Sequence, residues 1–280
     1  MHFVKGYFMQ QRRVFLVLGI LVWIYGCATL AEVREVKSLH EVAAAIDSDT
    51  LLVFDIDNTL IEPVGQLGSD QWFYYLYQIY KIEGVGEKEI ESRAMRVWNE
   101  TQALIQVQAP EGKFTAEFVK KQQTRGIKTM AMTARTLDIA EKTAQQLHSV
   151  GIDLSQNTVL KTDLLIEKKA LESEDDAKYT KGILFVGESN NKGKVLAHFL
   201  RINKLSPKKI VFVDDKVKHV NNVGIALQEL KIPYFGFRYG AVDDKVKQFN
   251  QVMADVVDKP TAELYLHGRL NNEKSKGNKR

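Results

Sequence analysis

Two aspartates stand two residues apart at the end of a short apolar run. Asp55 and Asp57 follow the apolar residues 51–54, a pattern typical of a buried strand. A carboxylate can act as a nucleophile toward phosphorus. A second carboxyl group nearby can donate a proton to the leaving oxygen and later accept one from water. The spacing therefore predicts phosphoryl transfer through Asp55, with Asp57 as the acid and base.

Two further side chains are expected to meet the transferred group. Thr133 closes a second apolar strand pattern, and Lys192 opens the amphipathic run 192–202. Phosphoryl transfer needs hydrogen-bond donors and a cation around the phosphoryl oxygens. We expect Thr133 to hydrogen-bond a phosphoryl oxygen. We expect Lys192 to pair with the phosphoryl group and with Asp55, which lowers carboxylate repulsion; Lys194 competes for this role.

A third apolar run ends in Asp214 and Asp215, which adds two carboxylates to the set. Mg²⁺ prefers hard oxygen ligands such as carboxylates and carbonyls. We expect a Mg²⁺ site made by Asp55, by Asp57 through its backbone carbonyl, and by Asp214. Asp215 is either a further ligand or a neighbour of the ligands.

Two side chains next to these motifs are candidates for substrate binding. Arg135 has the charge to hold a substrate phosphate, and the alternative is that it is solvated. Asn58 has an amide that could tune the site, and the alternative is that it only shapes the turn after Asp57.

These motifs, taken in order, resemble those of the haloacid dehalogenase (HAD) superfamily over residues 50–240. The four segments read VFDIDNTL (53–60), MAMT (130–133), NKG (191–193) and IVFVDD (210–215). The resemblance implies a doubly wound α/β sheet, Mg²⁺ and an aspartyl-phosphate intermediate. An acid at Asp57 is similar to the phosphatases and phosphomutases, whereas P-type ATPases carry threonine there. Within the superfamily the chain resembles an uncharacterised bacterial branch with exported members, so no substrate is implied.

The remaining pattern predicts an α/β fold with a parallel sheet. Apolar runs of strand length alternate with amphipathic runs of helix length, and this order favours parallel strands with right-handed crossovers. The expected strands cover residues 51–54, 127–132, 209–213 and 233–238, and the expected helices 36–46, 115–124, 137–150, 192–202 and 217–230. Residues 155–187 predict a short β excursion.

Residues 61–109 predict a small helical cap inserted after the first strand, with helices over 72–80 and 87–108. The core would then comprise residues 32–60 and 110–268. The cap resembles the first cap type of the HAD superfamily. Its dense aromatic residues are expected to pack the cap onto the core, with Trp72 and Tyr75 as candidates for the substrate entrance.

The N-terminus predicts export. Basic residues precede an apolar run over 14–30, as in a secretory signal covering residues 1–31. Cleavage after Ala31, lipidation at Cys27 and an uncleaved membrane anchor all remain open. The expected location is therefore periplasmic or membrane-anchored in a bacterial envelope. Residues 269–280 predict a basic, flexible tail.

Composition and charge exclude an intrachain disulfide but few classes of protein function. The 280-residue chain has a net charge of +4 and one cysteine, so an intrachain disulfide is excluded, and no basic stripe predicts nucleic-acid binding. We expect a Mg²⁺-dependent hydrolase of small-molecule phosphomonoesters. The alternatives are a phosphotransferase or phosphomutase using the same aspartate, and a non-catalytic HAD-fold binding protein of the envelope.

Overall fold

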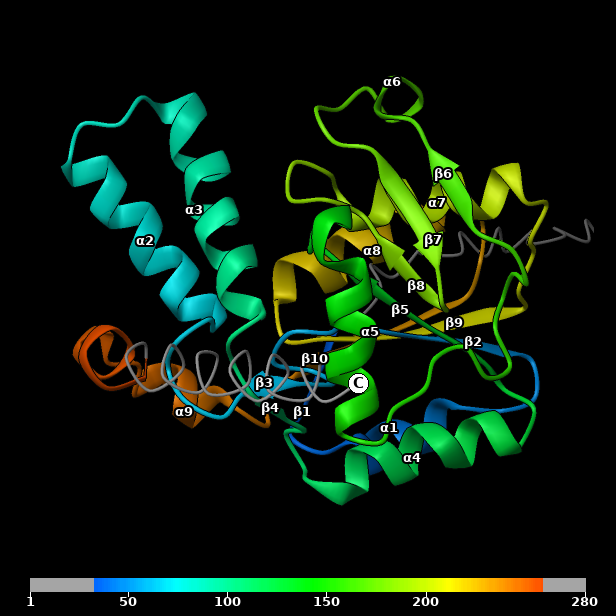
Figure 1. Ribbon diagram of the computed structural model, residues 1–280. Coiled ribbons are helices and arrows are strands. Elements are labelled where there is room, and N and C mark those ends of the chain that lie inside the picture. The colour runs from blue at the N-terminus through cyan, green and yellow to red at the C-terminus, as the bar shows by residue number, and fades with distance from the viewer. Residues whose placement is uncertain (1–32, 259–280) are drawn as a thin grey trace, which may run out of the picture.

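The computed structural model describes residues 33–258 of the chain (Figure 1). The expected signal or anchor over residues 1–31 and the basic tail over 269–280 lie outside the described residues. Within the described part, no helix combines the length and the apolar character needed to cross a bilayer.

An eight-stranded sheet forms the body of the protein. Six neighbouring strands are parallel, and the last two pair antiparallel at one edge. In spatial order they are β1 (Val33–Val36), β10 (Tyr234–Tyr239), β9 (Lys209–Asp214), β2 (Thr50–Phe54), β5 (Lys128–Thr133), β8 (Ile183–Phe185), β7 (Ala177–Thr180) and β6 (Leu164–Ile166).

Helices cover both faces of this sheet. Side chains alternate between the faces of a strand, so Leu52 and Phe54 of β2 join one core cluster, while Leu51 and Val53 join the other. The first cluster is covered by α1 (Leu39–Val42), α4 (Lys113–Thr124) and α5 (Ala140–Ser149), and the second by α7 (Lys192–Ile202) and α8 (Val217–Glu229). The fold is therefore the predicted doubly wound α/β type, and burial on both faces explains the continuous apolar runs.

The start of the fold differs from the prediction of one helix over residues 36–46. Residues 33–36 form the edge strand β1, and α1 begins only after Ser38. Ser38 accepts a hydrogen bond from the backbone of its own helix, while Glu41 accepts one from the Ser38 backbone N–H, a capping box that fixes the helix start. Because β1 precedes β2, the segment predicted as a cap follows the second of the described strands, not the first.

The segment between β2 and β5 contains two helices, α2 (Asp70–Ile82) and α3 (Glu87–Gln102), which stand beside the sheet (Figure 1). Ser69 accepts a hydrogen bond from the Trp72 N–H and caps α2, which begins two residues before the predicted residue 72. Helix α3 ends before the predicted residue 108. The chain there forms a two-stranded antiparallel ribbon between β3 (Glu62–Pro63) and β4 (Val107–Gln108).

The short elements of the body are consistent with the remaining patterns. The β excursion predicted within residues 155–187 is confirmed as β6, β7 and β8, with α6 (Lys168–Leu171) between the first two. Three 3-10 or π turns and a short helix complete the described chain: Ala43–Ala45, Leu137–Ile139, α9 (Asp243–Lys247) and Met253–Asp258.

Candidate active site

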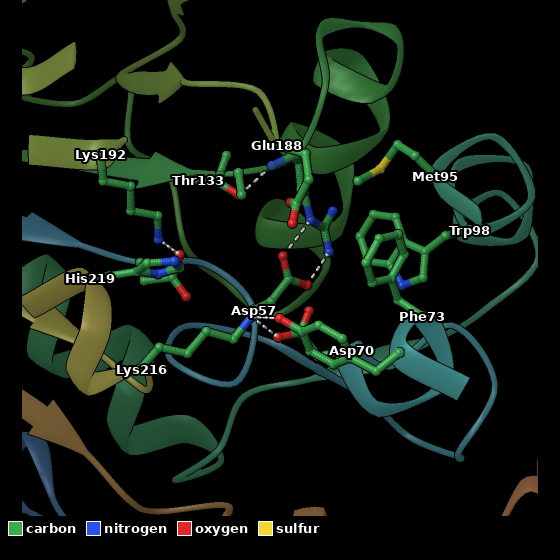
Figure 2. A pocket seen from close by; sticks show the side chains of 14 residues that line it. Asp57, Asp70, Phe73, Met95, Trp98, Thr133, Glu188, Lys192, Lys216 and His219 are labelled. Atoms are coloured by element: carbon green, nitrogen blue, oxygen red, sulfur yellow. Dashed lines mark hydrogen bonds and ion pairs between the residues drawn. The ribbon is translucent and has the colours of Figure 1, made fainter. Parts of the chain in front are cut away.

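The central strands bring the predicted residues together. Because β9, β2 and β5 are parallel neighbours, their carboxyl ends meet at one edge of the sheet. Asp55 follows β2, Thr133 ends β5 and Asp214 ends β9. A small pocket of about 40 Å³ opens at this edge (Figure 2). Its walls are formed by Asp55, Asp57, Asp70, Phe73, Tyr74, Met95, Trp98, Thr133, Ala134, Arg135, Glu188, Lys192, Lys216 and His219.

Lys192 reaches this edge from the first turn of α7. Asn191 caps the helix, and a Cβ on Gly193 would lie only 2.1 Å from the carbonyl oxygen of Asn222 in α8. Only glycine permits this close helix contact, which sets the depth of Lys192. The Lys192 Nζ lies 2.5 Å from Asp55 Oδ1 and 2.8 Å from Asp214 Oδ2. Lys194 is exposed, so Lys192 is the lysine that contacts the carboxylates.

Opposing effects set the charge of this buried cluster. Burial acts to lower the pKa of Lys192, but the nearby Asp214 and Asp55 carboxylates outweigh it and raise that pKa above its ordinary value. For Asp214, burial acts to raise the pKa, and Lys192 together with His219 outweighs it and lowers that pKa. Burial raises the pKa of Asp55 to about 7, although Lys192 opposes the rise.

Three carboxylates form a set suited to a hard cation. One oxygen each from Asp55, Asp214 and Asp215 lies within 4.8 Å of the others. The Oδ1 atom of Asp215 is buried and has no hydrogen-bond partner among the described residues. Its Oδ2 atom accepts a hydrogen bond from Asn58 Nδ2 at 3.2 Å. An all-oxygen donor set with one unsatisfied buried carboxylate oxygen fits Mg²⁺.

The side chain of Asp57 is not part of this set, and the predicted metal contact through its backbone carbonyl stays a prediction. The carboxylate turns instead to Arg135, which donates from Nε at 2.9 Å and from Nη2 at 2.8 Å. The Arg135 side chain is only 3% exposed, so the alternative that it is solvated is wrong. A substrate phosphate would have to compete with Asp57 for these Arg135 N–H groups, so the role of Arg135 in binding phosphate stays a prediction.

Thr133 and Asn58 both make hydrogen bonds within the protein. The Thr133 hydroxyl accepts a hydrogen bond from the Arg135 N–H at 3.1 Å and is buried at the pocket wall. Asn58 has a φ of 60°, a left-handed conformation that asparagine tolerates better than most residues. It therefore both shapes the turn and holds Asp215, while the substrate contacts of Thr133 and Asn58 remain predictions.

Several pocket residues were missed by the sequence reasoning. Lys216 Nζ lies 2.5 Å from Asp70 Oδ2, an ion pair between the body and the first turn of α2. His219 Nδ1 lies 3.2 Å from Asp214 Oδ2. The helical pattern after Asp215 places Lys216 and His219 on one side of the first turn of α8, a signal that could have found both.

The aromatic residues of the cap also divide differently from the prediction. Trp72 is 2% exposed and donates from Nε1 to Asp255 at 3.2 Å, away from the pocket. Phe73, Tyr74 and Trp98 line the pocket instead (Figure 2 labels Phe73 and Trp98). Tyr75 contacts the Phe249 ring and is not a pocket residue.

A wider groove of about 970 Å³ adjoins the pocket. Met95 and Glu188 line both, so the groove continues from this pocket along α3. Its walls carry more acidic than basic side chains, namely Glu91, Glu100, Asp138, Glu174, Asp175 and Glu188 against Arg96.

The family model that describes a protein of unknown function, DUF2608, matches residues 35–273. The chain belongs to the DUF2608 family. A relative named "Putative outer membrane protein" from Chlamydia pneumoniae is 29% identical over 225 residues, covering 78% of this chain and 82% of the relative. A protein of the same name from Chlamydia trachomatis is 27% identical over 209 residues, covering 74% and 76%.

Among solved structures, this DUF2608 member is similar to a haloacid dehalogenase-like hydrolase from Streptococcus pneumoniae. The TM-score is 0.41 and the sequence identity is 14%, with 71% of this chain and 91% of the other covered.

Mg²⁺ is expected to raise the melting temperature of the metal-free protein. A cation that binds only the folded state stabilises it by about 2.7 kcal/mol at a concentration of one hundred times Kd. Asp215→Asn removes one charge from the carboxylate set and is expected to abolish most of this shift. The measurement is thermal melting with MgCl₂ and with a chelator. The surface variant Asp163→Asn, whose side chain is 57% exposed, should keep the wild-type shift; an equal shift in Asp215→Asn would contradict the assignment.

Proposed function

We propose that this protein is a Mg²⁺-dependent phosphomonoester hydrolase that works through an aspartyl-phosphate on Asp55. The observation that carries the proposal is the position of Asp55. Its carboxylate ends a central strand, contacts the buried Lys192 at 2.5 Å and lies beside Asp214 and Asp215 at a pocket. Asp57, two residues on, supplies the second carboxyl group that hydrolysis needs.

In the first step, a carboxylate oxygen of Asp55 forms a bond to phosphorus while the ester P–O bond breaks. The leaving alkoxide takes a proton from the Asp57 carboxyl group. Lys192 offsets the negative charge that accumulates beside Asp55, and the Thr133 hydroxyl would donate to a phosphoryl oxygen. Mg²⁺ bound by Asp55, Asp214 and Asp215 would supply further positive charge at the phosphoryl oxygens.

In the second step, water bonds to phosphorus and gives its proton to the Asp57 carboxylate. The bond between phosphorus and Asp55 breaks, which releases phosphate and regenerates both carboxyl groups for another cycle. The net reaction consumes one ester and one water and yields one alcohol and one phosphate. In the described conformation both oxygens of Asp57 accept from Arg135, so Asp57 has to release at least one of these bonds in order to donate a proton.

The two cavities would divide the substrate between them. The catalytic pocket of about 40 Å³ has room for a phosphoryl group, and the groove of about 970 Å³ has room for the remainder. The acidic walls of the groove would repel a leaving group with several negative charges. We therefore propose that neutral or cationic phosphomonoesters are better substrates than nucleotides.

We also propose that the enzyme acts in the bacterial envelope. The N-terminal residues 1–31 have the pattern of a signal or anchor, and two relatives are named "Putative outer membrane protein". The proposed division is a core of residues 32–60 and 110–268 with a cap of residues 61–109.

The test is phosphate release by the full chain from a panel of sugar, alkyl, aminoalkyl and nucleoside phosphates. We expect release that depends on Mg²⁺, stops with chelator and is slowest for nucleotides. Folded, Mg²⁺-binding protein that releases no phosphate, even with an added alcohol as acceptor, would refute the hydrolase and leave the binding role. Transfer to the alcohol without hydrolysis would instead identify a phosphotransferase.

A further inference from the structure

We propose that Arg135 is a positioning residue that sets the orientation of the Asp57 carboxylate, and that helix α3 of the cap holds Arg135 in turn. The inference rests on the proposed function, because it concerns the carboxyl group that would move the proton. In this proposal Arg135 does not bind the substrate phosphate. Its role is to act through Asp57.

Arg135 contacts the Asp57 carboxylate at two points. Arg135 Nε lies 2.9 Å from Asp57 Oδ2, and Nη2 lies 2.8 Å from Asp57 Oδ1. A guanidinium that meets a carboxylate in this two-point manner fixes the plane of the carboxylate as well as its distance. The pair is well shielded, with side-chain exposures of 3% for Arg135 and 16% for Asp57. The orientation of Asp57 therefore follows that of the guanidinium.

Helix α5 of the body holds Arg135 in place by two hydrogen bonds. Its Nη1 donates to Thr143 Oγ1 at 3.0 Å and to Gln146 Oε1 at 2.7 Å, both on α5. Together with the bonds to Asp57, four of the five guanidinium N–H groups are engaged inside the protein. A substrate phosphate would have to displace internal partners, which is why we assign Arg135 to positioning.

Helix α3 of the cap contacts Arg135 directly and also contacts Gln146, which supports Arg135. The Trp98 ring of α3 faces the guanidinium with its centroid 5.1 Å from Arg135 Cζ, and Figure 2 shows Trp98 reaching the pocket from the cap side. Gln146 also donates from Nε2 to the Gln102 carbonyl oxygen at 3.3 Å and to its Oε1 at 3.2 Å. The residue that supports Arg135 is thus itself bonded to the end of α3.

These contacts couple the position of the cap to the orientation of Asp57, the residue that would transfer the proton. A movement of α3 away from the body would remove the Trp98 ring from the guanidinium and the Gln102 acceptors from Gln146 at the same time. Arg135 would then lose two of its supports, and its hold on Asp57 would loosen. Asp57 would release one Arg135 nitrogen to reach a leaving oxygen while the other nitrogen keeps its carboxylate oriented, so the cap, by holding Arg135, would control this step.

The test compares two monoesters whose leaving groups differ in how much they need a proton from the general acid. Benzyl phosphate releases a basic alkoxide and depends on the acid, whereas 4-nitrophenyl phosphate releases a stable phenolate and depends on it little. We expect Arg135→Lys, which cannot make the two-point contact, to lower kcat for benzyl phosphate at least ~10-fold more than for 4-nitrophenyl phosphate. The KM of each ester should change little. Trp98→Leu should show the same selectivity with a smaller loss.

Trp72→Leu is the matched control, because Trp72 is also a buried cap tryptophan but bonds to Asp255 and not to Arg135. Its effect should be equal for the two esters, and circular dichroism checks that each variant is folded. An equal loss for both esters in Arg135→Lys would overturn the inference while leaving the hydrolase intact. Absence of phosphate release from both esters by the wild type would instead refute the proposed function.

Discussion

Asp55→Asn is expected to abolish phosphate release from every ester, with a loss of about 10⁴-fold or more in kcat. The amide has nearly the same shape as the carboxylate, but its oxygen is a poor nucleophile and cannot form the phosphorylated intermediate. The measurement is phosphate release under saturating Mg²⁺. Mass spectrometry of quenched wild-type protein should also find the phosphoryl group on the peptide that contains Asp55, and the variant should lack it.

The control for this variant is Asp49→Asn, at the opposite end of the same strand, where the side chain is about half exposed. It should retain wild-type turnover. Asp55→Asn should also remain folded, because it removes one negative charge from a set of three close carboxylates, two of them buried. Normal turnover by folded Asp55→Asn would refute the assignment of the nucleophile.

Lys192→Met is expected to lower the free energy of unfolding by about 3–5 kcal/mol in metal-free protein. The substitution keeps most of the side-chain volume but removes the cation that lies 2.5 Å from Asp55 and 2.8 Å from Asp214. Uncompensated buried charges are costly in a medium of low dielectric constant. Urea unfolding in the presence of a chelator measures the loss, and turnover is expected to fall with it.

The matched control is Lys194→Met, two residues further along the same helix and exposed to solvent. It should change the free energy of unfolding by no more than ~0.5 kcal/mol. Mg²⁺ should reduce the stability loss of Lys192→Met, since the bound cation would replace part of the missing positive charge. Equal losses in the two lysine variants would show that the ion pairs of Lys192 contribute nothing to folding.

Much of this site was accessible from the sequence because each part closes a regular element. The apolar runs before Asp55, Thr133 and Asp214 are long enough to mark strands, and parallel neighbours must bring their carboxyl ends together. The start of α7 at Lys192 was equally clear from its helical period. Local pattern and topology were sufficient for these residues.

The contacts that could not be predicted depend on how the cap lies on the body. The ion pair of Lys216 with Asp70 and the contact of Trp98 with Arg135 join segments far apart in the chain, and no spacing rule encodes them. Strand β1 was missed for a related reason. Its four residues carry little apolar pattern, and their conformation is fixed by pairing with β10 near the other end of the described chain.

The ribbon between β3 and β4 has a consequence for the order of folding. The central pairing of β2 with β5 joins Leu51 to Lys128, and a flexible loop of that length has to be closed before the pairing can form. The antiparallel contact of Glu62 with Gln108 closes the intervening segment on itself and brings its ends side by side. Once the ribbon has formed, the search for the β2–β5 register is made by a much shorter effective loop, so early pairing of β3 with β4 would speed assembly of the core.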